Sequence, residues 1–336
     1  MKLSELNPGD RLFCPFSYAN VLVMTAGSSL TIHLFKKLAI IYLSLQFCDH
    51  TMKKIILISI SISVSIAALA QKDSTEKRSH GKFSLEYATN SVFNGRKDSV
   101  TTPYTTPTIG YEDRSGFYVN GSFSYLTRSG DTRIDEFSID AGYDFSIGNF
   151  DGEIAGEKNF YNKNSTNVSA EEKGSLSARA AYDFNVVSFF LSPGIHFNKK
   201  SDIALSAGLE HAFNPNEGDF SITPAVTFNG STLNFYQSYF DQRKYKNLRK
   251  NNPNSKVKAT VKNASTFSLL DYEFSLPAEY KKGNFTFTVT PYYTVPLNPA
   301  EVTVQITPNI GPVRTNTFTE KLSNTFYVSF GVECRF

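Results

Sequence analysis

Acidic side chains recur on one face of the segments in which apolar and polar residues alternate most regularly. Residues two apart in a strand point to the same side, so these charges would share one surface. Ten carboxylates against three basic side chains would concentrate cations if water reached that surface. The charged residues concerned are Glu86, Glu136, Asp140, Asp144, Asp151, Glu153, Glu157, Arg179, Asp183, Glu210, Glu333 and Arg335, with Lys82 as the third base.

Nucleophilic chemistry would need a histidine beside a hydroxyl or thiol, and only His80, His196 and His211 follow residue 70. His196 alone shares the polar face, with Ser192 four positions earlier. At ~3.3 Å per residue the two lie roughly 13 Å apart along a strand, too far for a Ser–His hydrogen bond. We therefore predict a polar lining role for His196 and no catalytic residue.

Motifs for cofactors and metals are also missing from residues 71–336. This part contains no Gly-rich phosphate loop, no H-E-x-x-H and no C-x-x-C. Cys334 is its only cysteine, so neither an internal disulfide nor a cysteine-based zinc site can form there. We expect no cofactor, no metal site and no enzymatic activity.

The last thirteen residues, NTFYVSFGVECRF, carry the clearest alternation in the chain. Their period of two predicts a strand with one oily face and one polar face that includes Glu333 and Arg335. The oily face is formed by Phe326, Val328, Phe330, Val332 and Phe336.

Similar alternation fills the preceding sequence, which has 29 Phe and 18 Tyr but no Trp. Thirteen strands are expected to start near residues 83, 104, 117, 134, 150, 176, 187, 203, 220, 233, 267, 285 and 326. An up-and-down barrel with both ends of the chain on one side needs an even number. Either residues 256–262 add a strand or one assignment is wrong, so we predict twelve or fourteen strands.

Four prolines argue against a barrel that spans a membrane. Pro107, Pro193, Pro224 and Pro291 all fall inside expected strands. Each removes a backbone donor that lipid cannot replace. Bulges or positions near the rims would tolerate them. A soluble secreted all-β protein with prolines on edge strands is the alternative.

A secretory signal peptide is indicated at residues 52–70. Lys53 and Lys54 precede an apolar run that ends in Ala68-Leu69-Ala70, an A-x-A cleavage pattern. Residues 1–51 are then expected to be an upstream extension that is absent from the mature protein, and 71–80 a short polar lead. The all-β domain would occupy residues 81–336.

The charge balance of residues 71–336 gives no support to a nucleic-acid partner. The first 70 residues hold six Lys/Arg and three Asp/Glu, which leaves 28 of each sign in residues 71–336. A chain without basic excess lacks the electrostatic footprint of a nucleic-acid-binding protein.

The signal peptide, the repeated alternation and the aromatic C-terminus together resemble those of bacterial outer-membrane β-barrel proteins. The resemblance implies an all-β, transmembrane antiparallel up-and-down barrel located in the cell outer membrane. Its surroundings would be outer-membrane lipid and lipopolysaccharide, and its C-terminal strand would engage the barrel-assembly machinery. The oligomeric state stays open.

Two functions fit such a barrel. The acidic face suggests a passive pore or small-solute channel if the interior is wide, whereas a narrow interior would form a plug around Arg179 and Arg335. The alternative is a non-transporting barrel that displays binding loops, chiefly residues 241–262 and 297–323. A basic cluster in the first loop could hold lipopolysaccharide phosphates or simply keep the loop soluble; its members are Arg243, Lys244, Lys246, Arg249 and Lys250.

Overall fold

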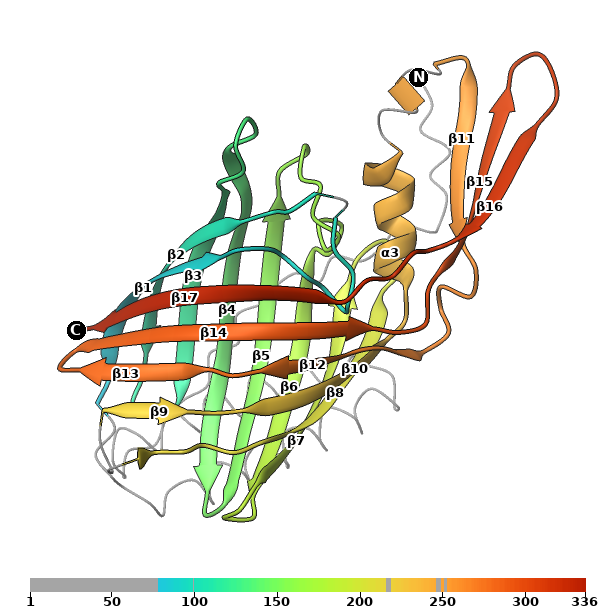
Figure 1. Ribbon diagram of the computed structural model, residues 1–336. Coiled ribbons are helices and arrows are strands. Elements are labelled where there is room, and N and C mark those ends of the chain that lie inside the picture. The colour runs from blue at the N-terminus through green and yellow to red at the C-terminus, as the bar shows by residue number, and fades with distance from the viewer. Residues whose placement is uncertain (1–77, 99, 216–218, 246–248, 251–252) are drawn as a thin grey trace, which may run out of the picture. The chain divides into compact units, whose positions relative to one another are not determined.

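The computed structural model describes residues 78–336 except 99, 216–218, 246–248 and 251–252, so the expected signal peptide and upstream extension lie outside the described residues. The described chain forms a closed antiparallel β-barrel (Figure 1). The wall follows chain order, with β12 paired to β14 and β17 paired back to β1. Its strands are β1 (His80–Ala88), β2 (Tyr104–Glu112), β3 (Phe117–Leu126), β4 (Arg133–Ile147), β5 (Phe150–Tyr161), β6 (Gly174–Asp183), β7 (Ser188–Phe197), β8 (Asp202–Glu210), β9 (Phe220–Ile222) with β10 (Ala225–Ser231), β12 (Ser268–Ser275) with β13 (Ala278–Lys282), β14 (Phe285–Pro296) and β17 (Thr325–Arg335).

The terminal strand has the role that its alternation predicts, because β17 closes the wall between β14 and β1. Its register places Cys334 opposite Phe83 and Val332 opposite Leu85, so apolar side chains meet apolar side chains across the seam. Closure leaves no free edge in the described strands of the barrel wall, which is the condition for a sheet to cross lipid.

The barrel has twelve strands, because β9 with β10 and β12 with β13 each form one interrupted strand. The strand expected near residue 233 is wrong: residues 234–239 form helix α3 (Asn234–Tyr239), continued by the π-helical turn η4 (Phe240–Lys244). The Asp202 carboxylate accepts hydrogen bonds from the backbone N–H groups of Asn234 and Phe235, both at 2.7 Å. This carboxylate at the helix start comes from 32 residues away, so no local pattern announces it.

Of the four prolines expected inside strands, Pro224 lies at a break, whereas Pro107, Pro193 and Pro291 lie within β2, β7 and β14. The chain leaves strand geometry at Thr223 and Pro224, and the neighbouring strand does so at Leu276 and Pro277. The two breaks face each other, because the Thr223 N–H donates to the Pro277 carbonyl at 2.8 Å. The lost ladder bond is thus replaced within the protein, which is what a proline in a membrane wall requires.

The two ends of the barrel differ. One, the turn end, has short connections such as residues 148–149 and 283–284, where Gly148 and Gly283 have φ values of 60° and 59°. The other, the loop end, carries the long connections 89–103, 162–173, 232–267 and 297–324. Short turns at one end and long loops at the other are typical of outer-membrane barrels.

The outer face of the wall is apolar. Phe326 is 65% exposed, Ile109 64% and Ile203 62%, and large aliphatic and aromatic side chains recur at alternate positions around the strands. Such a surface would be costly in water but favourable in hydrocarbon. The chain is therefore a membrane-spanning barrel of the outer-membrane type, and a soluble all-β fold does not fit this surface.

Two long connections build a second, smaller structure at the loop end, which we call the cap. It contains α3, η4 and a three-stranded sheet of β11 (Ser255–Val261), β15 (Glu301–Pro308) and β16 (Arg314–Thr319) (Figure 1). Residues 256–262 therefore do form a strand, but in the cap and not in the wall. The cap has its own apolar core, with Phe235, Ala259, Leu270 and Val302 each at most 1% exposed. In the described part of the chain, no helix is both long and apolar enough to cross a membrane.

The apolar outer face makes a testable prediction about one pair of neighbouring residues in β1. Leu85→Arg places a charge against lipid and should lower the free energy of unfolding by about 2–4 kcal/mol. Ser84→Arg, one position away on the inner face, should change it far less. Guanidinium unfolding of the lipid-reconstituted barrel measures both; equal losses would show that Leu85 does not contact lipid.

Candidate functional site

The inner face of β4 and β5 carries an acidic strip, formed by Glu136, Asp140, Asp144, Asp151, Glu153 and Glu157. The register sets Asp140 opposite Glu157 and Asp144 opposite Glu153. Directly opposed side chains in antiparallel strands have Cβ atoms ~5 Å apart, and like charges there destabilise the pair. A strip of this kind favours a cation between its members.

Neutral donors satisfy several of these carboxylates. Tyr118 Oη donates to Glu153 at 2.5 Å, and Asn120 Nδ2 donates to Asp140 at 2.8 Å. Tyr118 lies opposite Gly142, where a Cβ atom would stand only 2.5 Å from the phenol oxygen. Gly142 thus leaves room for the ring. Because hydroxyl and amide donors bring no charge, these bonds position the carboxylates without neutralising them.

The predicted basic residues each join one carboxylate. Arg179 faces Glu153 in the register, yet its guanidinium binds Glu210 at 2.7 Å and stacks on Phe190 with 3.9 Å from Cζ to the ring centroid. Arg335 pairs with Glu333 at 2.7 Å. These separate pairs differ from the plug around both arginines that a narrow interior would require.

Two further residues of the predicted set lie toward the turn end. Lys82 binds Glu112 at 2.6 Å, and Glu112 was not part of our expected inner set. Asp183 ends β6 and accepts a hydrogen bond from the Asn185 backbone N–H at 2.7 Å. The charge near this end is thus held in local pairs and turns.

The wall formed by β12, β14 and β17 carries a second acidic and aromatic group. Glu273 accepts hydrogen bonds from Thr294 at 2.6 Å and from Tyr327 at 2.9 Å. Tyr327 stacks on Tyr292 with ring centroids 4.6 Å apart and an interplanar angle of 7°. The alternation places all four residues on the inner face. The predicted set contained only charged side chains of the clearest strands, so it left out Glu273 of β12 and the uncharged Tyr292, Thr294 and Tyr327.

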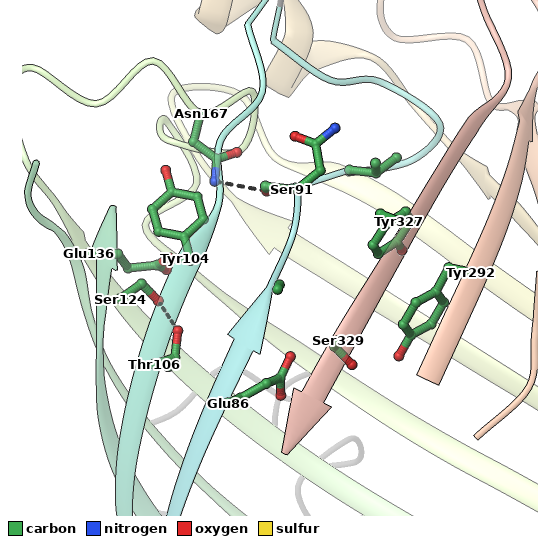
Figure 2. Close-up of a pocket in the computed structure, with 13 residues that line it drawn as sticks. Glu86, Ser91, Tyr104, Thr106, Ser124, Glu136, Asn167, Tyr292, Tyr327 and Ser329 are labelled. Atoms are coloured by element: carbon green, nitrogen blue, oxygen red, sulfur yellow. Dashed lines mark hydrogen bonds between the residues drawn. The ribbon is translucent and has the colours of Figure 1, made fainter. Parts of the chain in front are cut away.

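A cavity of about 320 Å³ lies between Tyr292 and Tyr327 and the connection 89–103, which we call loop 1. Figure 2 shows Tyr104 and Glu136 on one side of Ser91, Tyr292 and Tyr327 on the other, and Glu86 below. Ser91 accepts a hydrogen bond from Asn167 Nδ2 at 3.1 Å, which ties loop 1 to the connection 162–173. Loop 1 therefore lines the interior of the barrel at its loop end.

Loop 1 contains a tight turn at Asn94 and Gly95, whose φ values are 48° and 71°. Backbone hydrogen bonds join Phe93 and Arg96 in both directions, at 2.8 and 2.9 Å. An Asn-Gly pair with positive φ at both residues is the type I′ hairpin signal, and it was available in the sequence. The turn sends Phe93 against Phe235 of the cap core, with ring centroids 5.0 Å apart.

Arg96 fixes loop 1 to the cap. Its side chain is fully buried, and it donates to the carbonyls of Leu270, Leu297 and Asn298 at 2.8–3.1 Å. Burial lowers the pKa of Arg96, while the Glu320 carboxylate, 3.6 Å from Nε, opposes that shift. Glu320 in turn accepts a hydrogen bond from Tyr236 Oη at 2.6 Å, and burial raises the pKa of Tyr236. One guanidinium thus joins three segments that are distant in sequence.

The predicted basic cluster does not form a single exposed patch. Arg243 donates to the carbonyls of Asn162 and Ser165 at 2.8 and 3.0 Å and pairs with Glu171. Arg249 donates to the Val257 carbonyl at 3.4 Å. Arg249 therefore holds parts of the cap together, and Arg243 ties the cap to the connection 162–173. Lys244 and Lys250 are exposed, and Lys246 lies outside the described residues.

His196 lies on the inner face, with Nδ1 2.8 Å from a carboxylate oxygen of the buried Glu172. Its ring also contacts Phe93 edge-on, with centroids 5.9 Å apart. These contacts give His196 a structural partner in the connection 162–173. Within the described residues, no group of three or more His, Cys, Asp and Glu side chains is arranged to hold a metal ion.

No protein-family model matches the chain, and no curated protein matches its sequence. Among solved structures, it is similar to a KdgM porin at 10% identity and a TM-score of 0.41, covering 76% of this chain and 99% of that chain. It is also similar to a NanC porin at 8% identity and a TM-score of 0.42, covering 76% and 100%. The fold assignment rests on the strand pairing described above.

The Arg96 contacts predict a local change in stability. Arg96→Met removes the guanidinium hydrogen bonds to the carbonyls of Leu270, Leu297 and Asn298 and should cost about 3 kcal/mol in the stability of loop 1. The Phe93 and Arg96 amides, which close the tight turn, should then exchange with solvent about 100-fold faster.

Hydrogen exchange of the folded barrel measures those two amides directly. Lys97→Met is the matched control, because Lys97 is the next residue and its side chain is exposed. This variant should leave the Phe93 and Arg96 amides protected from exchange. Unchanged protection in Arg96→Met would show that other contacts hold loop 1.

Proposed function

We propose that the chain is a passive outer-membrane channel that favours small cationic and neutral solutes. The observation that carries the proposal is the acidic strip, in which Asp140 opposes Glu157 and Asp144 opposes Glu153 on the inner face of a closed barrel. Fixed carboxylates raise the local cation concentration and repel anions. Twelve strands give an interior between the side-chain-filled barrel of ~8 strands and the aqueous channel of ~16.

Loop 1 and the stacked tyrosines would form the narrow part of this channel. They line the cavity of about 320 Å³ together with Glu86 and Glu136. A carboxylate-lined passage bounded by aromatic rings suits a cation, because both the charge and the ring faces attract it. We infer that the loop end faces the cell exterior, since long loops of such barrels do.

We infer no enzymatic role. The most plausible base, His196, is held by Glu172, and each arginine of the predicted interior set forms one ion pair. The arrangement supports passage or retention of a solute through electrostatics, with no bond made or broken.

The acidic strip predicts a selectivity change. In planar bilayers the unaltered protein should be cation-selective, and the Asp140→Asn/Glu157→Gln double variant should lower the ratio of K⁺ to Cl⁻ permeability several-fold. The loss should be larger at low salt, because salt screens the fixed charges. Reversal potentials under a KCl gradient measure it.

The control is Glu301→Gln, which removes a partly exposed carboxylate from the cap and should leave the selectivity unchanged. A folded wild-type barrel that never conducts would rule out the channel. A conducting barrel with the same selectivity in the double variant would show that the strip does not set it.

Display of a binding surface is the second candidate function, and the separate apolar core of the cap favours it. Replacing residues 233–266 and 298–323 together by short Gly-Ser linkers should leave a barrel that still resists SDS until heated. If the cap serves recognition, this variant should keep the K⁺ to Cl⁻ permeability ratio. Failure of the variant to close into a barrel would instead assign the cap a structural role.

A further inference from the structure

A second cavity, of about 340 Å³, lies in the cap and is separate from the acidic interior. We call it the cap cleft. Loop 1 lines it with Arg96 and Lys97, and the helical segment lines it with Lys244 and Tyr245. Phe318 and residues 320–323 complete it. Three segments distant in sequence therefore meet around one hollow. A volume in this range suits a single ring with one or two substituents.

Positive charge dominates the side chains around the cap cleft. Lys97, Lys244 and Lys321 are all exposed at its margin. In the described part of the chain, neither Lys97 nor Lys321 forms a hydrogen bond or an ion pair. Their ammonium groups can thus turn toward a ligand without breaking an existing contact.

The carboxylates of the cap cleft are already engaged by the protein. Glu320 accepts hydrogen bonds from Tyr236 Oη at 2.6 Å and from the Ala300 backbone N–H at 3.2 Å. Asp98 is buried and accepts from Tyr239 Oη at 3.5 Å. With Arg96 counted, four cationic and two anionic side chains line the cleft, an excess of two positive charges.

Arg96 adds a buried feature to this charge excess. Its side chain is fully buried, and its Nε has no hydrogen-bond partner among the described residues, although Glu320 stands 3.6 Å away. A buried donor left without an acceptor is costly. An anion in the cleft would offset the desolvated charge beneath it.

Aromatic rings form the apolar side of the cleft. Tyr245 stacks on Phe240 with centroids 5.9 Å apart and an interplanar angle of 28°, and Phe318 meets Phe240 at 6.4 Å and 66°. Tyr245 and Phe318 are half-buried, so each keeps ring surface for a ligand. The cleft therefore combines an apolar wall with cationic groups at its margin.

We propose that the cap cleft binds a phosphorylated sugar, either free or as the headgroup of a glycolipid. A phosphate carries about −1.5 to −2 charge at pH 7 and fits the excess of positive charge. Lysines bind phosphate as mobile point charges, without the planar geometry that arginine imposes. The ring of the sugar would lie against Tyr245 and Phe318.

Calorimetric titration of the full chain, folded in detergent, tests the proposal with glucose 1-phosphate, glucose and inorganic phosphate as probes. Glucose 1-phosphate should bind more tightly than either of the others. The Lys97→Gln/Lys321→Gln double variant should weaken its binding at least tenfold, and both changes are at exposed side chains that the fold does not need. Phe318→Leu should weaken the binding of glucose 1-phosphate and leave the binding of inorganic phosphate unchanged.

The matched control is Lys281→Gln/Lys282→Gln, which removes two exposed lysines at the turn end and should leave binding unchanged. Equal binding of glucose and glucose 1-phosphate, or equal binding by the Lys97/Lys321 variant and the wild type, would overturn the proposal. So would binding of inorganic phosphate alone, because the ring would then contribute nothing.

A second arm separates the two sources of the phosphorylated sugar. Vesicles containing lipid A, with and without its phosphates, are mixed with the same proteins. Retention on phosphorylated vesicles that the Lys97/Lys321 variant loses assigns the cleft to a glycolipid headgroup, and binding of free glucose 1-phosphate alone assigns it to a soluble ligand. Equal retention of the wild type and the Lys97/Lys321 variant on the phosphorylated vesicles would count against the cap cleft as the binding site. Conductance is not the readout, so loss of the channel proposal would leave this result intact.

Discussion

Backbone hydrogen bonding in a solvent without donors or acceptors is the constraint on which this structure depends. A strand edge left open in lipid would carry a row of unpaired N–H and C=O groups. The first and last strands of the wall must therefore pair with each other. The pairing of β1 with β17 meets that requirement, and the alternation of side chains follows from it. Once the wall is closed, every second residue faces lipid and the others face the interior. Both the apolar exterior and the acidic strip result from this geometry.

The same geometry explains what could be predicted from sequence. Alternation with a period of two is visible in a single sequence. It was therefore enough to predict which side chains of β4 and β5 face the interior and which side chains of β17 form its apolar face. The helix at residues 234–239 was not, because Asp202 supplies its N-terminal carboxylate from a distant strand. Arg96 was missed for a related reason, since its partners are carbonyls of residues about 170 to 200 positions later. The Asn94-Gly95 turn, in contrast, was a local signal that was open to use. Interactions between distant segments thus limited the prediction, while local periodicity did not.

Charge is distributed differently in the two parts of the molecule. In the acidic strip, the carboxylates of Glu153 and Asp140 are held by hydroxyl and amide donors, so their charge remains available to a passing ion. Around the cap cleft, the carboxylates of Glu320 and Asp98 are bound by tyrosines, and exposed lysines define the surface. Loop 1 belongs to both parts, because Ser91 lines the interior while Arg96 and Lys97 line the cap cleft. A single short loop therefore connects a surface that attracts cations to one that attracts anions.

The composition of the cap core has a consequence for how two long connections of the barrel come together. Phe235 and Ala259 precede β12 and β14 in the chain, whereas Ala300 and Val302 follow them. In the folded protein the two connections start from neighbouring strands, because β12 pairs with β14. The core therefore buries Phe235 and Tyr236 with residues from both sides of this strand pair, so burial of these rings would report that the two connections have come together.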